Sequence, residues 1–319
     1  MKWWFVVVVV LLVGCRNSRK VLLPESIGNP YEVLVVSDDS IWAGIVSEEL
    51  KTPVYGLPQE EPSFDVSTVD ARHLNGTLRT TRNIVIVRSA GAKDAAHGMR
   101  VQHDVHSSPQ IQVVIDASSA EQLRKQMHQN GRKLRRVLTE NEMKVAHEEL
   151  ASRHNEVAEQ TIQRMFSVEM LIPADMTSSK VGQDFLWLSN NSADAMQNIC
   201  IYIYKKGVDL QGVNWVSVRD SVMRANIPGE EPGMYMRTVN EKNECLVVGR
   251  MEGQRYSFSG LWEMKGDMMG GPFSSVAIAD TVNRRIIVAE AFVYAPGRPK
   301  RNLMMSLLPV LSPVNIHLK

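Results

Sequence analysis

The stretch that decides the fold is residues 118–165, which read SSAEQLRKQMHQNGRKLRRVLTENEMKVAHEELASRHNEVAEQTIQRM. Apolar residues recur along it at helical spacing and the positions between them are densely charged, which is the pattern of an amphipathic helix with one exposed side. Gly131 is its weakest point, because glycine disfavours helix. The stretch therefore predicts a long helix or a helix pair that joins two halves. The apolar stripe consists of Leu123, Met127, Leu134, Val137, Leu138, Val145, Leu150, Val157 and Ile162.

The residues before this helix predict an N-terminal α+β half over residues 30–117. Ser40 can cap a helix that runs to Leu50, and Pro53 ends it. Residues 89–109 are polar and rich in Gly, His and Ser, so they predict a loop. Four short runs with β-branched residues predict strands, at residues 31–36, 64–69, 83–87 and 110–115.

The residues after the helix, 166–319, predict a second α+β half. Helices are expected over residues 215–224 and 299–311. Strands are expected at residues 166–173, 185–188, 199–204, 244–251, 256–264, 274–279 and 285–293. We therefore predict an α+β fold of two open, mostly antiparallel sheets packed by helices, with the long charged amphipathic helix between the halves.

The N-terminus carries a targeting signal. Lys2 precedes an apolar run from Trp3 to Val13, which fits a signal-peptide core and is too short to span a bilayer. The run ends in Leu12-Val13-Gly14-Cys15, which resembles a bacterial lipobox. We therefore predict a signal peptide over residues 1–14, lipidation (diacylglyceryl and palmitate chains) of Cys15, and a tether over residues 15–29. The alternative is an ordinary buried strand, since valine favours β structure.

The residue after Cys15 bears on location. By resemblance to enteric sorting rules, Arg16 in place of Asp favours the outer membrane, and the absence of an acidic cluster after Cys15 favours its periplasmic face. Two or three acyl chains suffice for stable anchoring, because each buried methylene contributes roughly 0.8 kcal/mol. We expect a soluble body held at the membrane by this anchor.

Composition excludes some classes of function. Of the 36 basic residues, Lys2 lies in the leader, so 35 remain against 35 acidic ones. A chain without a basic excess is not a general nucleic-acid binder, and 44% hydrophobic residues argue against disorder. Beyond Cys15, the chain has Cys200 and Cys245. They could form a disulfide in an oxidising compartment, or could be two small buried hydrophobic residues.

Residues 256–302 hold the densest run of unusual residues and give the candidate binding surface. Trp262 is expected either in the core or exposed beside methionines that would make an adaptable apolar surface. Gly270 and Gly271, before Pro272, suggest dihedrals that only glycine tolerates, in a tight connection or in a loop facing a ligand. The whole candidate surface comprises Trp262, Met269, Gly270, Gly271, Pro272, Tyr235, Arg298, Lys300 and Arg301.

Cations surround the start of the last predicted helix. Arg298, Lys300 and Arg301 there could bind an anion such as a phosphate or carboxylate, or be solvated, or pair with an acid such as Glu290. Arg219 and Asp220 predict a buried structural pair in the second half.

Catalytic signatures are absent from the sequence: it contains no Gly-x-Ser-x-Gly, His-Glu-x-x-His or Cys–His pattern. An enzyme would need paired acids near Trp262, such as Glu263, Asp267 or Asp280, which turns and solvent-facing positions explain equally well. The cluster His97, His103, Asp104 and His106 fits a solvated loop better than a metal site, because no helix register aims its ligands. We assign no catalytic residue, metal or cofactor.

The second half resembles an uncharacterised family of lipoproteins from anaerobic gut-type Gram-negative bacteria, known only as a domain of unknown function. The motifs that carry the resemblance occur in order: 185–188 (FLWL), 219–220 (RD), 227–229 (IPG), 235–236 (YM), 260–262 (GLW), 266–267 (GD), 269–273 (MGGPF), 292–296 (FVYAP) and 300–301 (KR). One departure is Glu290-Ala291, where the family has Glu-Gly, which puts a local turn in doubt. The resemblance implies a lipid-anchored envelope protein with no established activity.

The function expected from the sequence is a lipid-anchored binding or scaffold module of the periplasm or outer membrane. Its partners would be the membrane, through Cys15, and either an envelope protein or a small anionic ligand, with no nucleic acid. The alternative is an envelope hydrolase that uses carboxylates near Trp262. The missing catalytic signature favours binding over catalysis.

Overall fold

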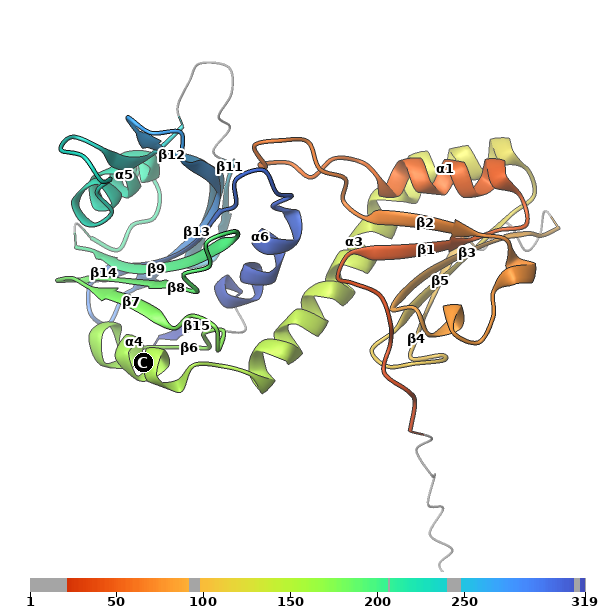
Figure 1. The fold of residues 1–319 in the computed structure, drawn as a ribbon, viewed down its shortest axis with the longest axis horizontal. Coiled ribbons are helices and arrows are strands. Elements are labelled where there is room, and N and C mark those ends of the chain that lie inside the picture. The colour runs from red at the N-terminus through yellow and green to blue at the C-terminus, as the bar shows by residue number, and fades with distance from the viewer. Residues whose placement is uncertain (1–21, 92–97, 206, 240–247, 313–315, 319) are drawn as a thin grey trace, which may run out of the picture.

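A long helix lies between two sheets. The computed structural model describes residues 22–91, 98–205, 207–239, 248–312 and 316–318. Within them, the 33-residue helix α3 (Ala120–Ser152) runs from a five-stranded sheet to an eight-stranded sheet (Figure 1). The predicted α+β class is confirmed.

The N-terminal unit is built on the five-stranded sheet, whose strand order is β2-β1-β3-β5-β4. Its strands are β1 (Glu32–Val36), β2 (Asp65–Val69), β3 (Asn83–Ser89), β4 (Met99–His103) and β5 (Ile111–Ala117), and helix α1 (Ser40–Leu50) connects β1 to β2. Residues just before β1 also belong to this unit, because Glu25 bridges to Ser108 and Ile27 to Thr81. The predicted tether, residues 15–29, therefore overlaps the folded unit.

Pairing in this sheet differs from the antiparallel expectation. Strands β1–β2, β1–β3 and β3–β5 pair in parallel, and only β4–β5 is antiparallel. Strand β5 is buried at every position, and such continuous apolar runs are typical of parallel strands covered on both faces. The predicted loop over residues 89–109 is also wrong in part, because β4 forms the sheet edge there with mostly exposed side chains.

Two helices cover one face of this sheet. Helix α1 and the first half of α3 pack side by side on it, and Leu50, Leu123 and Leu134 are fully buried there. Gly131 is a point of close approach between these helices rather than a helix break. A Cβ at Gly131 would lie 2.1 Å from the Glu49 side chain. The short helices η1 (Ala71–His73) and η2 (Leu78–Thr80) flank residues that pack on the opposite face.

The predicted long helix or helix pair is a pair of helices, and it breaks at residues 153–155 rather than at Gly131. Helix α4 (Glu156–Phe166) begins after Asn155, whose side-chain oxygen accepts from the Ala158 N–H at 3.1 Å. The Asn155 backbone N–H donates to the Ile172 carbonyl at 2.7 Å, which turns the chain toward the second sheet. An asparagine N-cap is a strong helix start, so a new helix begins here although the charged pattern continues.

The C-terminal unit is built on the eight-stranded sheet, in which every pairing is antiparallel. The strand order is β10-β12-β13-β14-β9-β8-β7, and β11 also pairs with β12. The strands are β7 (Ser178–Val181), β8 (Phe185–Ser189), β9 (Met196–Tyr204), β10 (Tyr235–Thr238), β11 (Val248–Glu252), β12 (Arg255–Lys265), β13 (Gly270–Asp280) and β14 (Arg285–Tyr294). A separate pair joins β6 (Val168–Met170) to β15 (Ile316–Leu318).

Both faces of this sheet are covered. Helix α5 (Trp215–Asn226) packs on one face. Helix α4, helix α6 (Arg301–Leu307), η3 (Leu308–Leu311) and the β6–β15 pair pack on the other (Figure 1). The predicted C-terminal helix is therefore an α-helix followed by a 3₁₀ turn at Pro309.

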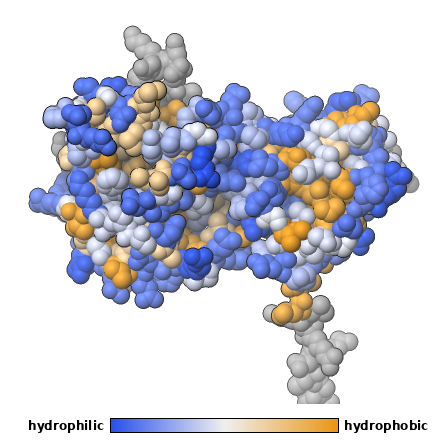
Figure 2. All heavy atoms as spheres, in the orientation of Figure 1, coloured by the Kyte–Doolittle hydropathy of each residue, from blue (hydrophilic) through white to orange (hydrophobic). Residues whose placement is uncertain are grey.

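Hydrophilic residues cover most of the face seen in Figure 2, with smaller apolar patches on both units. No helix in the described ranges is both long enough and apolar enough to cross a bilayer.

Candidate functional site

Trp262 lies in the core, so an exposed binding surface centred on it is wrong. Its side chain is 3% exposed, its indole N–H donates to the Val293 carbonyl at 3.2 Å, and its ring centroid lies 5.5 Å from that of Phe292. The alternation of β12 explains this, because Phe258, Trp262 and Met264 all face the α5 side of the sheet.

The Gly270–Pro272 segment also serves packing. Both glycines lie in β13 and neither has a positive φ, so the expected dihedral requirement is wrong. A Cβ at Gly271 would lie 2.0 Å from the Val293 carbonyl oxygen, and one at Gly270 would lie 2.8 Å from the Trp262 carbonyl oxygen. Glycine is required here because another strand and the Trp262 backbone approach closely.

The start of α6 contacts the N-terminal unit, which pairs with one of the three predicted cations, Arg301. The Glu61 carboxylate accepts from the backbone N–H groups of Lys300 and Arg301, at 2.7 and 2.8 Å. The Arg301 guanidinium, which is buried, pairs with Asp65 and donates to the Pro62 carbonyl. The anion predicted at this helix start is thus a carboxylate of the same chain, and Glu290 is not its partner. Arg298 remains exposed.

The other surface candidates lie apart from these. Tyr235 is half-buried, with the Arg224 guanidinium 3.8 Å and the Lys265 ammonium 5.2 Å from its ring centroid. Met269 is half-buried, on the α5 side of the sheet. The predicted binding surface is therefore divided among the core, the contact between the units and the β10 edge.

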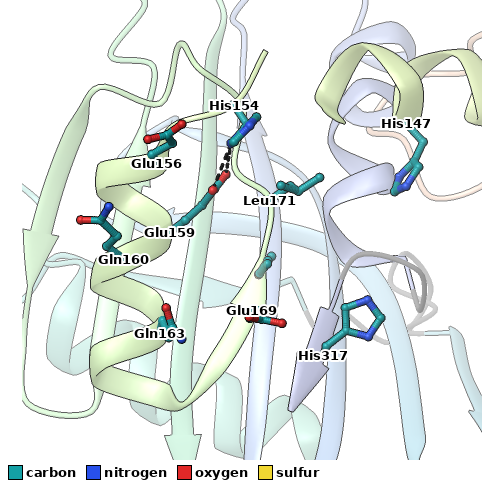
Figure 3. A pocket seen from close by; sticks show the side chains of 10 residues that line it. His147, His154, Glu156, Glu159, Gln160, Gln163, Glu169, Leu171 and His317 are labelled. Carbon is teal, nitrogen blue, oxygen red and sulfur yellow. Dashed lines mark hydrogen bonds and ion pairs between the residues drawn. The ribbon is translucent and has the colours of Figure 1, made fainter. Parts of the chain in front are cut away.

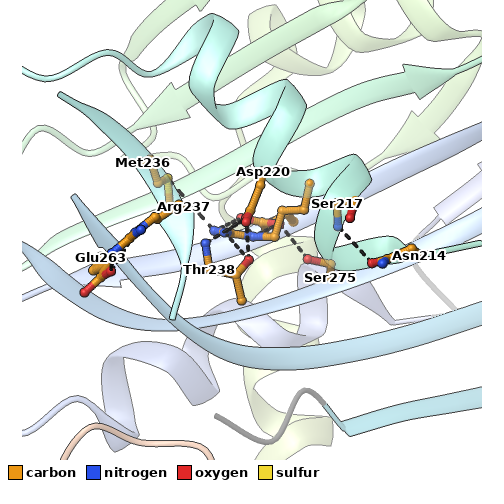
Figure 4. Close-up of polar contacts among 10 residues, drawn as sticks. Asn214, Ser217, Asp220, Met236, Arg237, Thr238, Glu263 and Ser275 are labelled. Atoms are coloured by element: carbon orange, nitrogen blue, oxygen red, sulfur yellow. Dashed lines mark hydrogen bonds and ion pairs between the residues drawn. The ribbon is translucent and has the colours of Figure 1, made fainter. Parts of the chain in front are cut away.

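The buried partner of Arg219 is Glu290 rather than Asp220; Figure 4 labels Asp220 and the neighbouring Thr238 and Ser275. Both side chains are fully buried, and Arg219 Nε lies 2.9 Å from Glu290 Oε2 while Nη2 lies 2.9 Å from Oε1. Arg219 Nη1 donates to the Thr238 hydroxyl at 3.0 Å, and Asp220 lies further away at 3.7 Å. Ser275 donates to Glu290 at 2.7 Å. This network ties α5 to the sheet and is sealed from solvent, so it is structural.

Glu290 also explains two neighbouring groups. It lies inside β14 with Ala291, so the residue that departs from the family pattern sits in a strand and not in a turn. Burial, and then the nearby Glu290 carboxylate, raise the pKa of the Cys200 thiol and of the Tyr202 phenol well above their ordinary values. Cys200 forms no disulfide within the described part of the chain, and Cys245 lies outside it, as does Cys15.

The carboxylates proposed for catalysis near Trp262 do not share a pocket. Glu263 pairs with Arg237, Asp267 is exposed in the β12–β13 turn, and Asp280 pairs with Arg285. Glu263 lies opposite Gly270, at the start of β13, whereas Asp280 ends that strand roughly 33 Å away. His97 lies outside the described residues, and no group of metal-binding side chains is found among those that are described.

A groove at the α3–α4 break gathers titratable side chains that the sequence patterns did not single out. We call it the α4 groove; it has a volume of about 520 Å³. Its walls come from the end of α3, the α3–α4 break, α4, β6 and β15 (Figure 3). The lining residues are His147, His154, Glu156, Glu159, Gln160, Gln163, Glu169, Met170, Leu171 and His317.

An oriented imidazole forms the upper edge of this groove in Figure 3. His154 Nδ1 lies 2.9 and 3.0 Å from the two carboxylate oxygens of Glu159, and Glu159 also accepts from the Ile172 N–H at 3.0 Å. A carboxylate only accepts, so Nδ1 carries a proton; when the ring is neutral, Nε2 is then an acceptor. The backbone fixes His154 as well, through its bridge to Pro173. The same geometry orients histidines in acid–base and metal sites.

Sequence reasoning missed the groove because its residues come from four elements separated by up to 170 positions, between His147 and His317. The one local signal is the series Glu156, Glu159, Gln160 and Gln163. These polar residues recur at three- and four-residue spacing, so they share one face of α4, but such a face also fits a solvated helix.

Comparisons with known proteins give matches without an activity. Residues 155–312 match a family model described as Domain of unknown function (DUF4837), and residues 26–151 match one described as Domain of unknown function (DUF8532). The recognition of an uncharacterised domain family is confirmed at this level. No curated protein matches the chain.

Two solved structures are similar to part of the chain. The 1.9 Å crystal structure of the Saccharomyces cerevisiae Ran-binding protein Mog1p has 12% identity and a TM-score of 0.32, over 47% of this chain and 89% of that one. A structure of a point mutant of the protein Mog1 has 11% identity and a TM-score of 0.31, over 47% and 90%. Likeness at this level carries no functional argument.

Proposed function

We propose that this protein is a lipid-anchored binding protein of the bacterial cell envelope, attached through Cys15, with the α4 groove as its ligand site. The observation that carries the binding part is the oriented His154 at a groove of about 520 Å³, a volume typical of small-molecule sites. The groove replaces the surface that the sequence placed around Trp262, since Trp262 is buried.

The anchoring part rests on the sequence. The apolar run from Trp3 to Val13 followed by Gly14-Cys15 is what a lipoprotein signal requires, and Arg16 favours the outer membrane. Only six residues separate Cys15 from Leu22, where the described chain begins. A tether of this length reaches at most about 25 Å, so the N-terminal unit would stay close to the bilayer.

Fractionation of cells tests the anchor. The wild-type chain should sediment with membranes and incorporate labelled palmitate, whereas Cys15→Ala should do neither. Cys200→Ala is the matched control, because it removes a thiol that is buried in the core. A Cys15→Ala chain that still sediments with membranes and carries label would refute the anchor.

A thermal-shift screen of small polar compounds tests the groove. Ligands that stabilise the wild-type protein should lose their effect on Gln160→Trp, whose bulkier side chain would fill the groove from the exposed face of α4. Gln211→Trp, at an exposed position outside the groove, is the control. Hits that stabilise Gln160→Trp as well as the wild type would place the site elsewhere.

A second candidate, an envelope hydrolase, is supported by one observation. A histidine held by a carboxylate and facing a groove can act as a general base toward water. His154→Gln should then abolish release of soluble fragments from purified cell-wall material while leaving the melting temperature close to that of the wild type. Equal release by both proteins would exclude this activity.

A further inference from the structure

We infer that the α4 groove recognises a primary ammonium group on a small molecule that also carries hydroxyl or amide groups, such as an amino sugar. This inference rests on the proposed function and names the ligand class of the same site.

The charge of the groove favours a cation. Glu156, Glu159 and Glu169 are in its lining, which includes neither lysine nor arginine among the described residues. Glu156 is exposed, so its carboxylate can meet a ligand at the rim. The described lining has three carboxylates and no lysine or arginine, so it favours cations over phosphates and carboxylates.

Helix stabilisation alone does not explain this arrangement. Glu156 and Glu159 occupy the first turn of α4, where acids complement the helix dipole. Stabilisation of the helix does not require Glu159 to hold His154. It also does not explain why Glu169 from β6 and the imidazoles of α3 and β15 line the same groove. The groove therefore brings together more polar groups than the start of a helix alone would do.

The hydrogen-bonding groups fix the rest of the ligand class. His154 Nε2 offers an acceptor, which suits an N–H or O–H donor. Gln160 and Gln163 lie one turn apart on the exposed side of α4, and each amide can both donate and accept, as hydroxyl and amide groups require. Leu171 and Met170 add a small apolar wall.

Metal ions fit this arrangement less well than an organic amine. Imidazoles and carboxylates can bind zinc, but a site needs three or four of them within about 2 Å of one point. No such group exists among the described residues. A polyatomic ligand can instead span the groove and meet the separate groups one at a time.

Ligand-observed NMR titration of the full chain in detergent micelles tests the inference. The probes are glucosamine, N-acetylglucosamine, which has the same ring without the charge, and alanine amide, which has the amine without the ring. We expect glucosamine to bind with millimolar affinity, as befits a ligand of this size, and N-acetylglucosamine to bind at least about tenfold more weakly. Alanine amide binding more tightly than glucosamine would assign the amine to a peptide rather than a sugar, and would still support the ammonium class.

Variants locate the binding. Glu156→Gln and His154→Phe should each weaken glucosamine binding by about fivefold, because each removes one charge-assisted or hydrogen-bonded contact. Glu230→Gln, an exposed acid outside the groove, should leave it unchanged. Glu159→Gln should also weaken it, since Glu159 positions the His154 ring.

The outcomes separate this inference from the proposed function. If N-acetylglucosamine binds as tightly as glucosamine and Gln160→Trp removes both, the groove is a ligand site but the ammonium class is wrong. If neither amine binds, but Gln160→Trp abolishes the stabilisation by other library compounds, the groove is again a ligand site and the ammonium class is wrong. If no compound depends on Gln160, the groove function itself fails.

Discussion

Removal of the Arg219 guanidinium should cost far more stability than its single charge suggests. The change Arg219→Met puts an unbranched, apolar side chain in place of the arginine. It leaves the Glu290 carboxylate buried, and within the network described above only Ser275 still donates a hydrogen bond to it. The arginine side chain is 0% exposed and donates to Glu290 and Thr238 at 2.9–3.1 Å. Breaking one partner of such a buried pair destabilises by roughly 3–5 kcal/mol.

Urea unfolding followed by circular dichroism measures this effect. A loss of about 4 kcal/mol is a large part of the roughly 5–15 kcal/mol that holds a domain together, so the midpoint should fall steeply with an unchanged slope. The control is Arg250→Met, which breaks the exposed Arg250–Glu252 pair and should cost at most about 1 kcal/mol. Equal losses in the two variants would refute the reasoning, because they would show that Arg219 is worth no more than a surface charge.

A double-mutant cycle separates the pair from its burial. Glu290→Leu combined with Arg219→Met replaces both charges by apolar groups, and the double variant should be more stable than Arg219→Met alone. If the unfolding free energy of the double variant falls below that of the wild type by the sum of the two single losses, the two side chains act independently.

Three further predictions concern single residues. Tyr202→Phe should leave stability unchanged or raise it by about 1 kcal/mol in thermal unfolding, because the buried Tyr202 hydroxyl has no hydrogen-bond partner among the described residues. Burial raises the pKa of Asp280, but hydrogen bonds from Arg285 and Asn283 outweigh burial and lower this pKa overall. The ionised Asp280 therefore stabilises the folded state above its unfolded pKa, and this stabilisation is lost as the pH falls through its folded pKa. The difference in unfolding free energy between the wild type and Asp280→Asn should accordingly narrow from about pH 5 toward pH 3. Gly131→Ala should raise the stability in urea unfolding by up to about 1 kcal/mol, because alanine favours helix and the flexible Glu49 side chain that its Cβ would meet can turn away; a less stable variant would mean that the Arg135–Glu49 pair holds that side chain in place.

Local patterns predicted the elements well where burial alternates or repeats. The first strand, the α1 helix and the paired strands from β12 to β14 follow from β-branched runs, helical spacing and turns, although Asp39 rather than the predicted Ser40 caps α1. Pairing direction did not follow, because a buried parallel strand and a buried antiparallel strand have the same apolar sequence, and β1, β3 and β5 are buried on both faces. The α3–α4 break was missed because Asn155 looks like any polar residue of a charged helix until its capping bond is seen.

Candidate sites were harder to predict than elements, for a different reason. Trp262, Gly271 and Arg301 are chemically unusual residues, and the sequence placed them together by proximity along the chain. The structure uses each for packing: Trp262 in the core, Gly271 against Val293, and Arg301 against Asp65. The cluster of unusual residues in the sequence therefore corresponds to a tightly packed core and to an interface between the units, and not to a ligand site.

The groove and the contact between the units depend on the same geometry. Helix α3 belongs to the core of the N-terminal sheet through Leu123 and Leu134, yet its far end supplies His147 to a groove whose other walls are parts of the C-terminal unit. That far end packs on the C-terminal unit, because Leu150 lies in its core. The Glu61 and Arg301 contacts hold the two units together at a separate point. Because His154 sits in the break between α3 and α4 and is aimed by Glu159, the position of this break decides where the groove lies.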